Sequence, residues 1–307
     1  MKSMPSCEFK LNFKMSPLTT FRIGGLADVV AWPKTAQELI DVIGWAKSEG
    51  LGVTFLGGGS NILISDQGIR GLVILSTRMD QILCDEEFLE VEFGSGCSVQ
   101  RAVFWAAERS FSGLEFAGGL PGSLGGAVWM NARAYGGEVS QIVTKVEAVN
   151  QENEIEVLEN AQMEFEYKRS VFQKRPLYIT RCWLKFQQGE KEEILRVAQK
   201  NIADRRSKKQ ADIFSAGCAF KNNYSVGIPS GKLIQDAGLK GTVVGGARIL
   251  EEHANFFINA NHATAEDVIA LMKLAQKTVR EKFHVDIYPE VQFIGDFGDL
   301  LVDLKQG

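Results

Sequence analysis

VTFLGGGSN, residues 53–61, is a β-rich run that passes directly into three glycines, a serine and an asparagine. A glycine cluster at the end of a strand lets main-chain N–H groups approach a phosphate, because glycine has no Cβ and adopts positive φ. The alternative is that these glycines only make a tight turn. In both cases the run predicts a strand that ends in a loop within a mixed α/β domain.

A second glycine-dense segment, AGGLPGSLGGAVWMNARAYGGE, covers residues 117–138. Neither loop fits the dinucleotide pattern Gly-x-Gly-x-x-Gly or the P-loop pattern Gly-x-x-x-x-Gly-Lys-Ser/Thr, so both of these nucleotide sites are weakly supported. Two loops rich in glycine, serine and asparagine in one domain nevertheless favour a cofactor that carries a pyrophosphate. The composition of the loops does not name that cofactor.

The composition is that of an ordinary globular protein: 307 residues, 45% of them apolar and 23% charged. A formal net charge of −4 argues against nucleic acid or an anionic membrane as the main partner. No apolar run approaches the ~20 residues that span a bilayer, and MKSMPSCEFKLNF, residues 1–13, lacks the apolar stretch of a secretory signal. Because the five cysteines are dispersed without a Cys-x-x-Cys pair, we expect no disulfide framework, no metal site and a cytoplasmic location.

Hydrophobic periodicity predicts helices and strands along the whole chain. Thr35 begins a helix that runs to about residue 48, with Glu38 completing a capping box, and a polar helix over residues 190–206 ends in a basic cluster. The other predicted helices cover residues 99–108, 230–236 and 264–283. The predicted strands lie at residues 28–32, 53–56, 72–75, 89–93, 285–288 and 291–294, with further strand-like segments between 143 and 186. The polar helix marks a hinge between residues 1–204, in two parts of about 1–75 and 76–204, and residues 205–307.

Six motifs occur in an order and spacing typical of one enzyme family. They are LTTFRIGG (18–25), LGGGSNILISD (56–66), GLPGSLGGAVWMNARAYGGE (119–138), SAGCAFKN (215–222), GKLIQDAGLKG (231–241) and YPEVQFIG (288–295). Through them the chain resembles the UDP-N-acetylenolpyruvoylglucosamine reductase family over about residues 16–296. The resemblance implies an α+β fold, with a two-part FAD-binding region of the vanillyl-alcohol-oxidase type followed by a smaller α/β substrate-binding domain. The interval from Tyr167 to Ser215 is too short for the extra tyrosine-bearing loop of one subgroup, so the chain resembles the shorter class.

The resemblance also implies a reaction, cofactors and partners. NADPH would reduce FAD, and the flavin would reduce the enolpyruvyl ether of the UDP-sugar to the lactyl ether of UDP-N-acetylmuramate, a step of peptidoglycan synthesis that serves cell shape and division. The partners would be UDP-N-acetylglucosamine enolpyruvate and NADPH, with no nucleic acid and no membrane, and the protein would be a monomer. The residues around FAD would come from the two glycine loops: Gly57, Gly58, Gly59, Ser60, Asn61, Gly119, Pro121, Gly122, Ser123, Gly125, Gly126 and Ala127.

In the same family an acid stands at the position of Cys218 and a carboxyl group at that of Glu290. Taken alone, Cys218 would be interpreted as a buried filler, since free cysteine is among the most buried residue types. The family more often has a serine there that protonates an enolate, and a thiol with an ordinary pKa of about 8.5 gives up its proton more readily. Glu290 lies in an apolar stretch whose desolvation would favour a protonated carboxyl that stabilises the enolate. Taken alone, it could equally be a glutamate at a strand end that points into water.

The expected active-site cation departs from the family pattern. The family has an arginine directly after the tyrosine of a Tyr-Arg-x-Ser motif, whereas this sequence has YKRS, with Lys168 at that position and Arg169 after it. On a strand, a shift of one residue turns a side chain to the opposite face. Lysine also lacks the planar fork with which arginine binds a carboxylate through two hydrogen bonds. We expect either that Lys168 acts as a point charge or that the local backbone re-aims Arg169, and position favours Lys168.

Five further residues are candidates for substrate binding. Tyr135 matches a family position near the substrate phosphates or the flavin, although Arg133 replaces the small residue expected there. Asn222 matches a substrate-side asparagine. Lys232 and the lysine pair at 208–209 are candidate contacts of the diphosphate, and each lysine could equally be an ordinary surface residue.

Two other hypotheses remain open at this point. One is a flavin oxidase or dehydrogenase of the same cofactor fold with another substrate, and the other is a non-catalytic module that binds a nucleotide sugar or a protein. The set of Cys218, Asn222, Lys232 and Glu290 favours the reductase over the first, because the wider flavin superfamily is not expected to share it. The intact glycine loops argue against the second.

Overall fold

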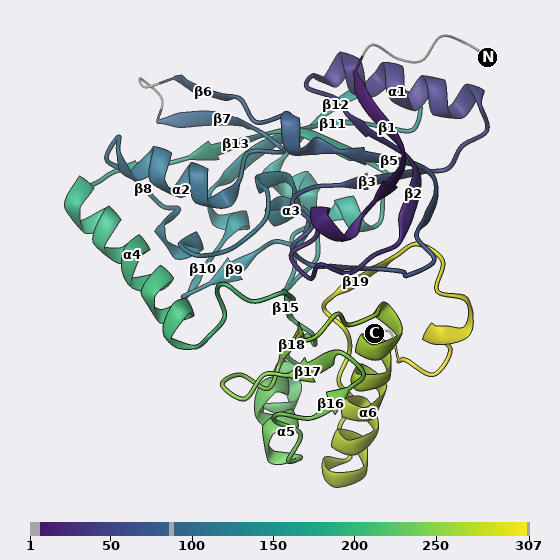
Figure 1. Cartoon of the computed structure of the whole chain (residues 1–307). Coiled ribbons are helices and arrows are strands. Elements are labelled where there is room, and N and C mark those ends of the chain that lie inside the picture. The colour runs from purple at the N-terminus through teal and green to yellow at the C-terminus, as the bar shows by residue number, and fades with distance from the viewer. Residues whose placement is uncertain (1–6, 86–88, 306–307) are drawn as a thin grey trace. The chain divides into compact units, whose positions relative to one another are not determined.

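The computed structural model of the chain describes residues 7–85 and 89–305 (Figure 1). By their internal contacts the residues form two compact units. The first comprises the residues up to 11, 29–58 and 71–204, and the second comprises 12–28, 59–70 and 205–307. Two short segments of the N-terminal third therefore belong to the same unit as the C-terminal part of the chain. The division of function at residue 204, into a cofactor part and a substrate part, stays a prediction.

A four-stranded sheet with the order β1-β2-β5-β3 carries helix α1 (Ala36–Ser48) on one face. Its strands are β1 (Glu8–Lys14), β2 (Leu26–Trp32), β3 (Val53–Leu56) and β5 (Ile69–Leu75). The predicted start of α1 is confirmed, because Thr35 Oγ1 accepts the N–H of Glu38 at 3.1 Å. The Glu38 carboxylate, however, accepts the N–H of Lys34 rather than that of Thr35, so only half of the predicted capping box forms.

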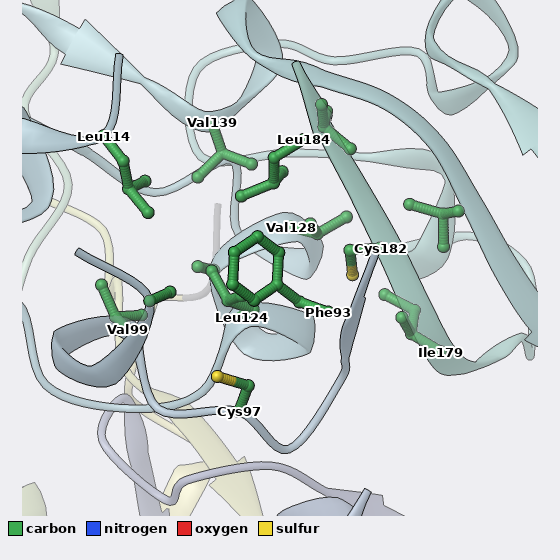
Figure 2. Packing of buried hydrophobic residues seen from close by; sticks show 14 of the residues in the cluster. Phe93, Cys97, Val99, Leu114, Leu124, Val128, Val139, Ile179, Cys182 and Leu184 are labelled. Carbon is green, nitrogen blue, oxygen red and sulfur yellow. The ribbon is translucent and has the colours of Figure 1, made fainter. Parts of the chain in front are cut away.

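A five-stranded antiparallel sheet with the order β12-β11-β13-β7-β6 lies at the centre of the first unit. Its strands are β6 (Ile82–Asp85), β7 (Glu90–Gly94), β11 (Val143–Val149), β12 (Ile155–Glu159) and β13 (Tyr178–Lys185). Figure 2 shows the core on one face of this sheet, where Phe93 and Cys182 lie among side chains from α2 (Val99–Ala107) and α3 (Leu124–Trp129). Burial raises the pKa of the Cys97 thiol to about 11 and also raises that of Cys182, so both thiols stay protonated and unreactive.

The second unit contains a four-stranded sheet with the order β15-β18-β17-β16. Its strands are β15 (Ser215–Cys218), β16 (Val243–Val244), β17 (Ala247–Ile249) and β18 (Phe256–Asn259). Helices α5 (Ser230–Asp236) and α6 (Ala265–Phe283) lie beside this sheet (Figure 1). Their apolar side chains share one buried cluster with it. Strand β19 (Gln292–Ile294) pairs in parallel with β4 (Ile62–Ile64), which ties the segment 59–70 to the C-terminal residues.

The remaining elements are one helix, four two-residue strands and eight short 3-10 helices. The helix is α4 (Lys191–Ser207), and the strands are β8 (Phe111–Ser112), β9 (Arg133–Ala134), β10 (Gly137–Glu138) and β14 (Gln187–Gln188). The 3-10 helices are Ser16–Leu18, Ser76–Arg78, Glu115–Ala117, Val139–Gln141, Asn160–Met163, Val171–Gln173, Tyr224–Val226 and Gly298–Leu301. These counts refer to the two described ranges.

Two secondary-structure predictions differ from the structure. Residues 285–288 do not form the predicted strand, because a side chain replaces a strand partner: Gln276 Nε2 donates to the Ile287 carbonyl at 2.8 Å. The second glycine segment is not a loop throughout, since α3 begins after Ser123, whose Oγ accepts the N–H of Gly126 at 3.4 Å. Gly125 and Gly126 therefore lie in a helix rather than in a loop.

Two classes of feature are missing from the part of the chain that the structure describes. None of its helices combines the length and the apolar character required to cross a membrane. No set of three or more histidine, cysteine or acidic side chains there is grouped as a metal site would require.

Candidate active site

The two glycine loops of the sequence meet in the first unit. The N–H of Gly58 donates to Ser123 Oγ at 3.1 Å, so the first loop is bonded to the residue that caps α3. A Cβ at Gly57 would lie 2.3 Å from Ser123 Oγ, and one at Gly58 would lie 2.7 Å from Gly122 Cα. The close approach of the two loops therefore requires glycine at both positions. Neither interpretation of the sequence, as a phosphate-binding loop or as a tight turn, included this role.

Other residues of the second loop keep main-chain groups available for a ligand. Gly119 and Gly122 adopt φ values of 83° and 101°, and their N–H groups have no hydrogen-bond acceptor within residues 7–85 and 89–305. A Cβ at Gly126 would meet only Ser123 Oγ, at 3.5 Å, and the residue is exposed. Free N–H donors beside an open glycine face fit the pyrophosphate of a dinucleotide cofactor.

A β-bulge positions Cys218 at the end of β15 in the second unit. Ser215 pairs with Ile258 and Cys218 with Phe256, so one extra residue lies on the β15 side, and Gly217 there adopts a φ of 79°. Bulges of this kind re-aim a side chain and are frequent beside active sites. The Cys218 side chain is half-buried and contacts the apolar cluster of Leu250, Phe256 and Ile258.

Glu290 lies on a segment that is hydrogen-bonded to the residue after Cys218. The Glu290 N–H donates to the Ala219 carbonyl at 2.8 Å, and the Glu290 carbonyl accepts from Asn61 Nδ2 at 3.2 Å and from Gln292 Nε2 at 3.0 Å. Glu290 precedes β19 rather than lying in it, and the residue is only 8% exposed, which does not fit a glutamate that points into water. The structure thus brings Cys218 and Glu290 together.

Asn61 was predicted to lie beside the cofactor, which stays a prediction, and its described hydrogen bonds are with the Glu290 segment. Besides the bond from its amide to the Glu290 carbonyl, its own carbonyl accepts the N–H of Gln292 at 2.9 Å. Asn61 therefore holds the backbone on both sides of Val291. Nothing in the sequence pattern separates this role from that of Ser60 beside it.

The two candidate substrate residues of the second unit differ in their surroundings. Asn222 Oδ1 accepts the N–H of Ser230 at 3.0 Å, so this amide supports the start of α5. Lys232 forms an ion pair with Asp236, one turn further along the same helix, and its side chain is exposed. Asn222 follows β15 in the chain, whereas Lys232 lies within α5.

The YKRS segment forms a turn. The prediction that neighbouring side chains point to opposite faces there, as on a strand, is therefore wrong. Glu166 and Arg169 exchange two main-chain hydrogen bonds, of 3.1 and 3.2 Å, across Tyr167 and Lys168. Lys168 has a φ of 59°, a conformation that non-glycine residues rarely adopt outside turns. Its side chain is half-buried, whereas Arg169 is exposed. The burial of the two side chains favours Lys168 as the cation.

Tyr135 lies in the tight turn of the β9–β10 hairpin, with a φ of 48°. Its hydroxyl donates to Asp204 Oδ2 at 2.8 Å, and it lies 3.0 Å from the Asn201 carbonyl, so the ring is tied to α4. The guanidinium of Arg133 lies 5.4 Å from the centre of the Tyr167 ring. Arg133, which replaces the small residue expected from the family, therefore connects the Tyr135 hairpin to the Lys168 turn.

The predicted site residues thus form two groups. The first unit contains Gly57, Gly58, the second glycine loop, Tyr135 and Lys168, and the second unit contains Gly59, Ser60, Asn61, Cys218, Asn222 and Glu290. The sequence prediction missed Asn255, whose amide contacts the backbone beside Cys218. No sequence signal identifies it, because its importance depends on a contact between residues 35 positions apart.

Comparisons with known proteins agree with this arrangement. Family models match residues 27–159 to an FAD binding domain and residues 208–294 to the C-terminal domain of UDP-N-acetylenolpyruvoylglucosamine reductase. Reductases of that name from Caldanaerobacter subterraneus subsp. tengcongensis and Bacillus subtilis are each 40% identical to this chain. The alignments cover 93% and 90% of this chain and 93% and 91% of the relatives.

The crystal structure of the UDP-N-acetylenolpyruvylglucosamine reductase from Thermus caldophilus is similar over 94% of this chain and 98% of that one, with a TM-score of 0.78 and 33% identity. Together with the family models, this similarity confirms the predicted fold class, an α+β chain in which an FAD-binding region precedes a second domain. FAD is likewise confirmed as the cofactor.

Proposed function

This chain belongs to the family of UDP-N-acetylenolpyruvoylglucosamine reductases, and from that premise we propose that it uses NADPH and FAD to reduce the enolpyruvyl ether of UDP-N-acetylglucosamine. It is an FAD-containing oxidoreductase of UDP-N-acetylmuramate synthesis. The single observation that best supports the finer proposal is the main-chain bond from Glu290 to Ala219, the residue that follows Cys218.

The reduction needs a hydride at one carbon of the double bond and a proton at its neighbour. FAD, held by the glycine loops and reduced by NADPH, would supply the hydride, and conjugation of the double bond with the carboxylate would direct it to the terminal methylene carbon. The electron pair of the double bond then lies on the carbon that bears the ether oxygen and on the carboxylate, as an enolate. Cys218 protonates that carbon from its thiol, which completes the lactyl ether and sets its configuration.

Glu290 stabilises the enolate before the proton arrives. A buried group that is held in place before the reaction stabilises developing charge without reorganising, which is commonly the largest catalytic contribution. Glu290 meets this requirement, since the residue is 8% exposed and three hydrogen bonds hold its backbone. Its carboxyl group is assigned the contact with the substrate carboxylate, where the charge of the enolate develops.

Lys168 supplies the positive charge of the site, and a pair of variants tests this assignment. We expect Lys168→Gln to slow flavin reoxidation by the enolpyruvyl substrate roughly 10–100-fold, the cost of losing one hydrogen bond to a charged group. Arg169→Gln is the matched control and is expected to stay near the wild-type rate, because Arg169 is the more exposed of the two. Rapid-mixing kinetics of both variants makes the measurement, and the reverse ranking would assign the role to Arg169.

Two glycine variants separate packing from cofactor binding in the glycine loops. We expect Gly58→Ala to lower both the thermal midpoint and the FAD content, since its Cβ would collide with Gly122. Gly126→Ala has room for its Cβ and removes a glycine from a helix interior, where alanine is favoured by about 1 kcal/mol. It should therefore keep or raise the thermal midpoint of the apoprotein while weakening FAD binding about tenfold, a loss of about 1.4 kcal/mol.

Fluorescence titration of each apoprotein with FAD, together with its thermal midpoint, makes that measurement. An unchanged FAD affinity in Gly126→Ala would show that this glycine face does not contact the cofactor.

The reaction itself is tested with the purified yellow protein. NADPH oxidation should depend on the enolpyruvyl UDP-sugar and should yield UDP-N-acetylmuramate in equal amount. A yellow protein that oxidises no NADPH when this substrate is added would instead indicate a flavin oxidase or dehydrogenase with another substrate. A stable fold without flavin would indicate a binding module.

A further inference from the structure

Asn255 is a buried asparagine, 3% exposed, that directly precedes β18. Its side chain pairs with both main-chain groups of Phe220. Oδ1 accepts the Phe220 N–H at 2.9 Å, and Nδ2 donates to the Phe220 carbonyl at 2.8 Å. Its own carbonyl accepts the Ala219 N–H at 2.7 Å. One residue thus makes three hydrogen bonds to the two residues that follow Cys218.

The ladder between β15 and β18 ends where these bonds begin. Cys218 and Phe256 are its last pair, because β15 ends at Cys218 and the chain before Phe256 turns away, with the Phe256 N–H bonded to the His253 carbonyl. An asparagine amide contains one donor side and one acceptor side, as a peptide unit does. The Asn255 side chain therefore takes the place of the missing strand residue and keeps 219–220 extended.

The opposite edge of the same segment holds Glu290. The Ala219 carbonyl accepts the Glu290 N–H at 2.8 Å, the Lys221 N–H donates to the Tyr288 carbonyl at 2.9 Å, and Phe220 forms a bridge with Pro289. Residues 219–221 consequently lie between Asn255 on one side and residues 288–290 on the other. Any shift of Phe220 would change the distance between Cys218 and Glu290.

We propose that Asn255 is a positioning residue of the reduction, which fixes the segment between Cys218 and Glu290 so that the proton donor and the enolate stabiliser keep one mutual geometry. This inference rests on the roles of Cys218 and Glu290 under the proposed function. Asn61 supports it independently, because a second asparagine amide holds the carbonyl of Glu290 itself. Two buried main-chain groups of Phe220 lose their partners when Asn255 is truncated, and groups of that kind move to find new ones.

The kinetic test compares the two half-reactions in Asn255→Ala. Flavin reduction by NADPH should stay within about twofold of wild type, while reoxidation by the enolpyruvyl substrate should slow roughly 10–100-fold, as a misplacement of about 1 Å does. Asn150→Ala is the matched control, since Asn150 is also a buried amide bonded to main-chain N–H groups, in a turn of the first unit. We expect both of its half-reactions to stay at wild-type rates.

Asn255→Asp supplies a readout that lost stability would not produce. An ionised carboxylate accepts the Phe220 N–H but cannot donate to the Phe220 carbonyl, whereas a protonated carboxyl can do both. The reoxidation rate of this variant, divided by that of wild type, should therefore rise as the pH falls. The titratable groups next to the position are His253, whose Nδ1 faces the Asn255 N–H, Cys218 and Glu290, and the wild-type profile accounts for their titration.

Amide hydrogen exchange adds a readout independent of the reaction. The N–H groups of residues 219–221 should exchange faster in Asn255→Ala than in wild type, while those of β17 are unchanged. Equal slowing of both half-reactions, or no slowing, would overturn the inference. Should Asn255→Ala not accumulate as folded protein, the pH profile of Asn255→Asp decides by itself, and a flat ratio would overturn it. A wild-type enzyme that the substrate does not reoxidise would instead refute the proposed function.

Discussion

Replacement of Cys218 by alanine is expected to leave flavin reduction by NADPH unchanged and to slow flavin reoxidation by the enolpyruvyl substrate roughly 10²–10⁴-fold, the usual contribution of a positioned general acid. The reason is that alanine has no proton to give to the enolate carbon. Stopped-flow absorbance of the flavin measures the two half-reactions separately. Equal loss in both would refute the role of Cys218 as the proton donor.

The serine variant is the matched control for Cys218→Ala. Cys218→Ser keeps a hydroxyl proton at the same position, so we expect it to retain activity. It should also lose the sensitivity to peroxide and to thiol alkylation that we expect of wild type, because a half-buried thiol beside flavin chemistry can be oxidised to sulfenic acid and beyond. Burial raises the thiol pKa of Cys7 and Cys97, which makes these two poor competitors for the reagents. Inactivation of Cys218→Ser at the wild-type rate would assign the sensitivity to another cysteine.

Replacement of Glu290 by alanine is expected to slow the same substrate half-reaction about 10²–10³-fold, the typical cost of removing one preorganised stabiliser of a developing oxyanion. Glu290→Gln should lose less, because a glutamine amide still donates a hydrogen bond from a similar position. Single-turnover rates of the reduced enzyme with excess substrate provide the measurement.

Glu252→Gln is the control for these variants, since Glu252 is an exposed carboxylate of the same unit. A glutamine variant as slow as the alanine variant would contradict a hydrogen-bonding role of Glu290 toward the enolate. Wild-type rates in both would contradict any role in stabilising the enolate.

The sequence predicted the helices and strands well where one local rule applied. The helix over residues 230–236 and the strand over 53–56 lie where the pattern of residue types predicted them. The predicted strand at 285–288 was wrong because Gln276, on α6, supplies the hydrogen bond that a neighbouring strand would otherwise supply. A pattern read along the chain contains no information about such a distant partner.

The candidate site shows the same limit. The motifs identified Cys218 and Glu290, and their common location follows only from the bond between Ala219 and Glu290. The prediction for YKRS assumed the alternating faces of a strand, because its residue types do not reveal the turn that the two bonds between Glu166 and Arg169 form. Asn255 was missed for a related reason, since an asparagine before a strand is unremarkable until its amide is seen to replace a strand residue.

A single turnover of the wild-type enzyme without NADPH tests the central claim most directly. The bound flavin is reduced photochemically under anaerobic conditions and then mixed with UDP-N-acetylglucosamine enolpyruvate. We predict that the absorbance of oxidised flavin returns in full and that one UDP-N-acetylmuramate forms per flavin. A flavin that stays reduced in the presence of this substrate, yet is reoxidised when oxygen is admitted, would contradict the account.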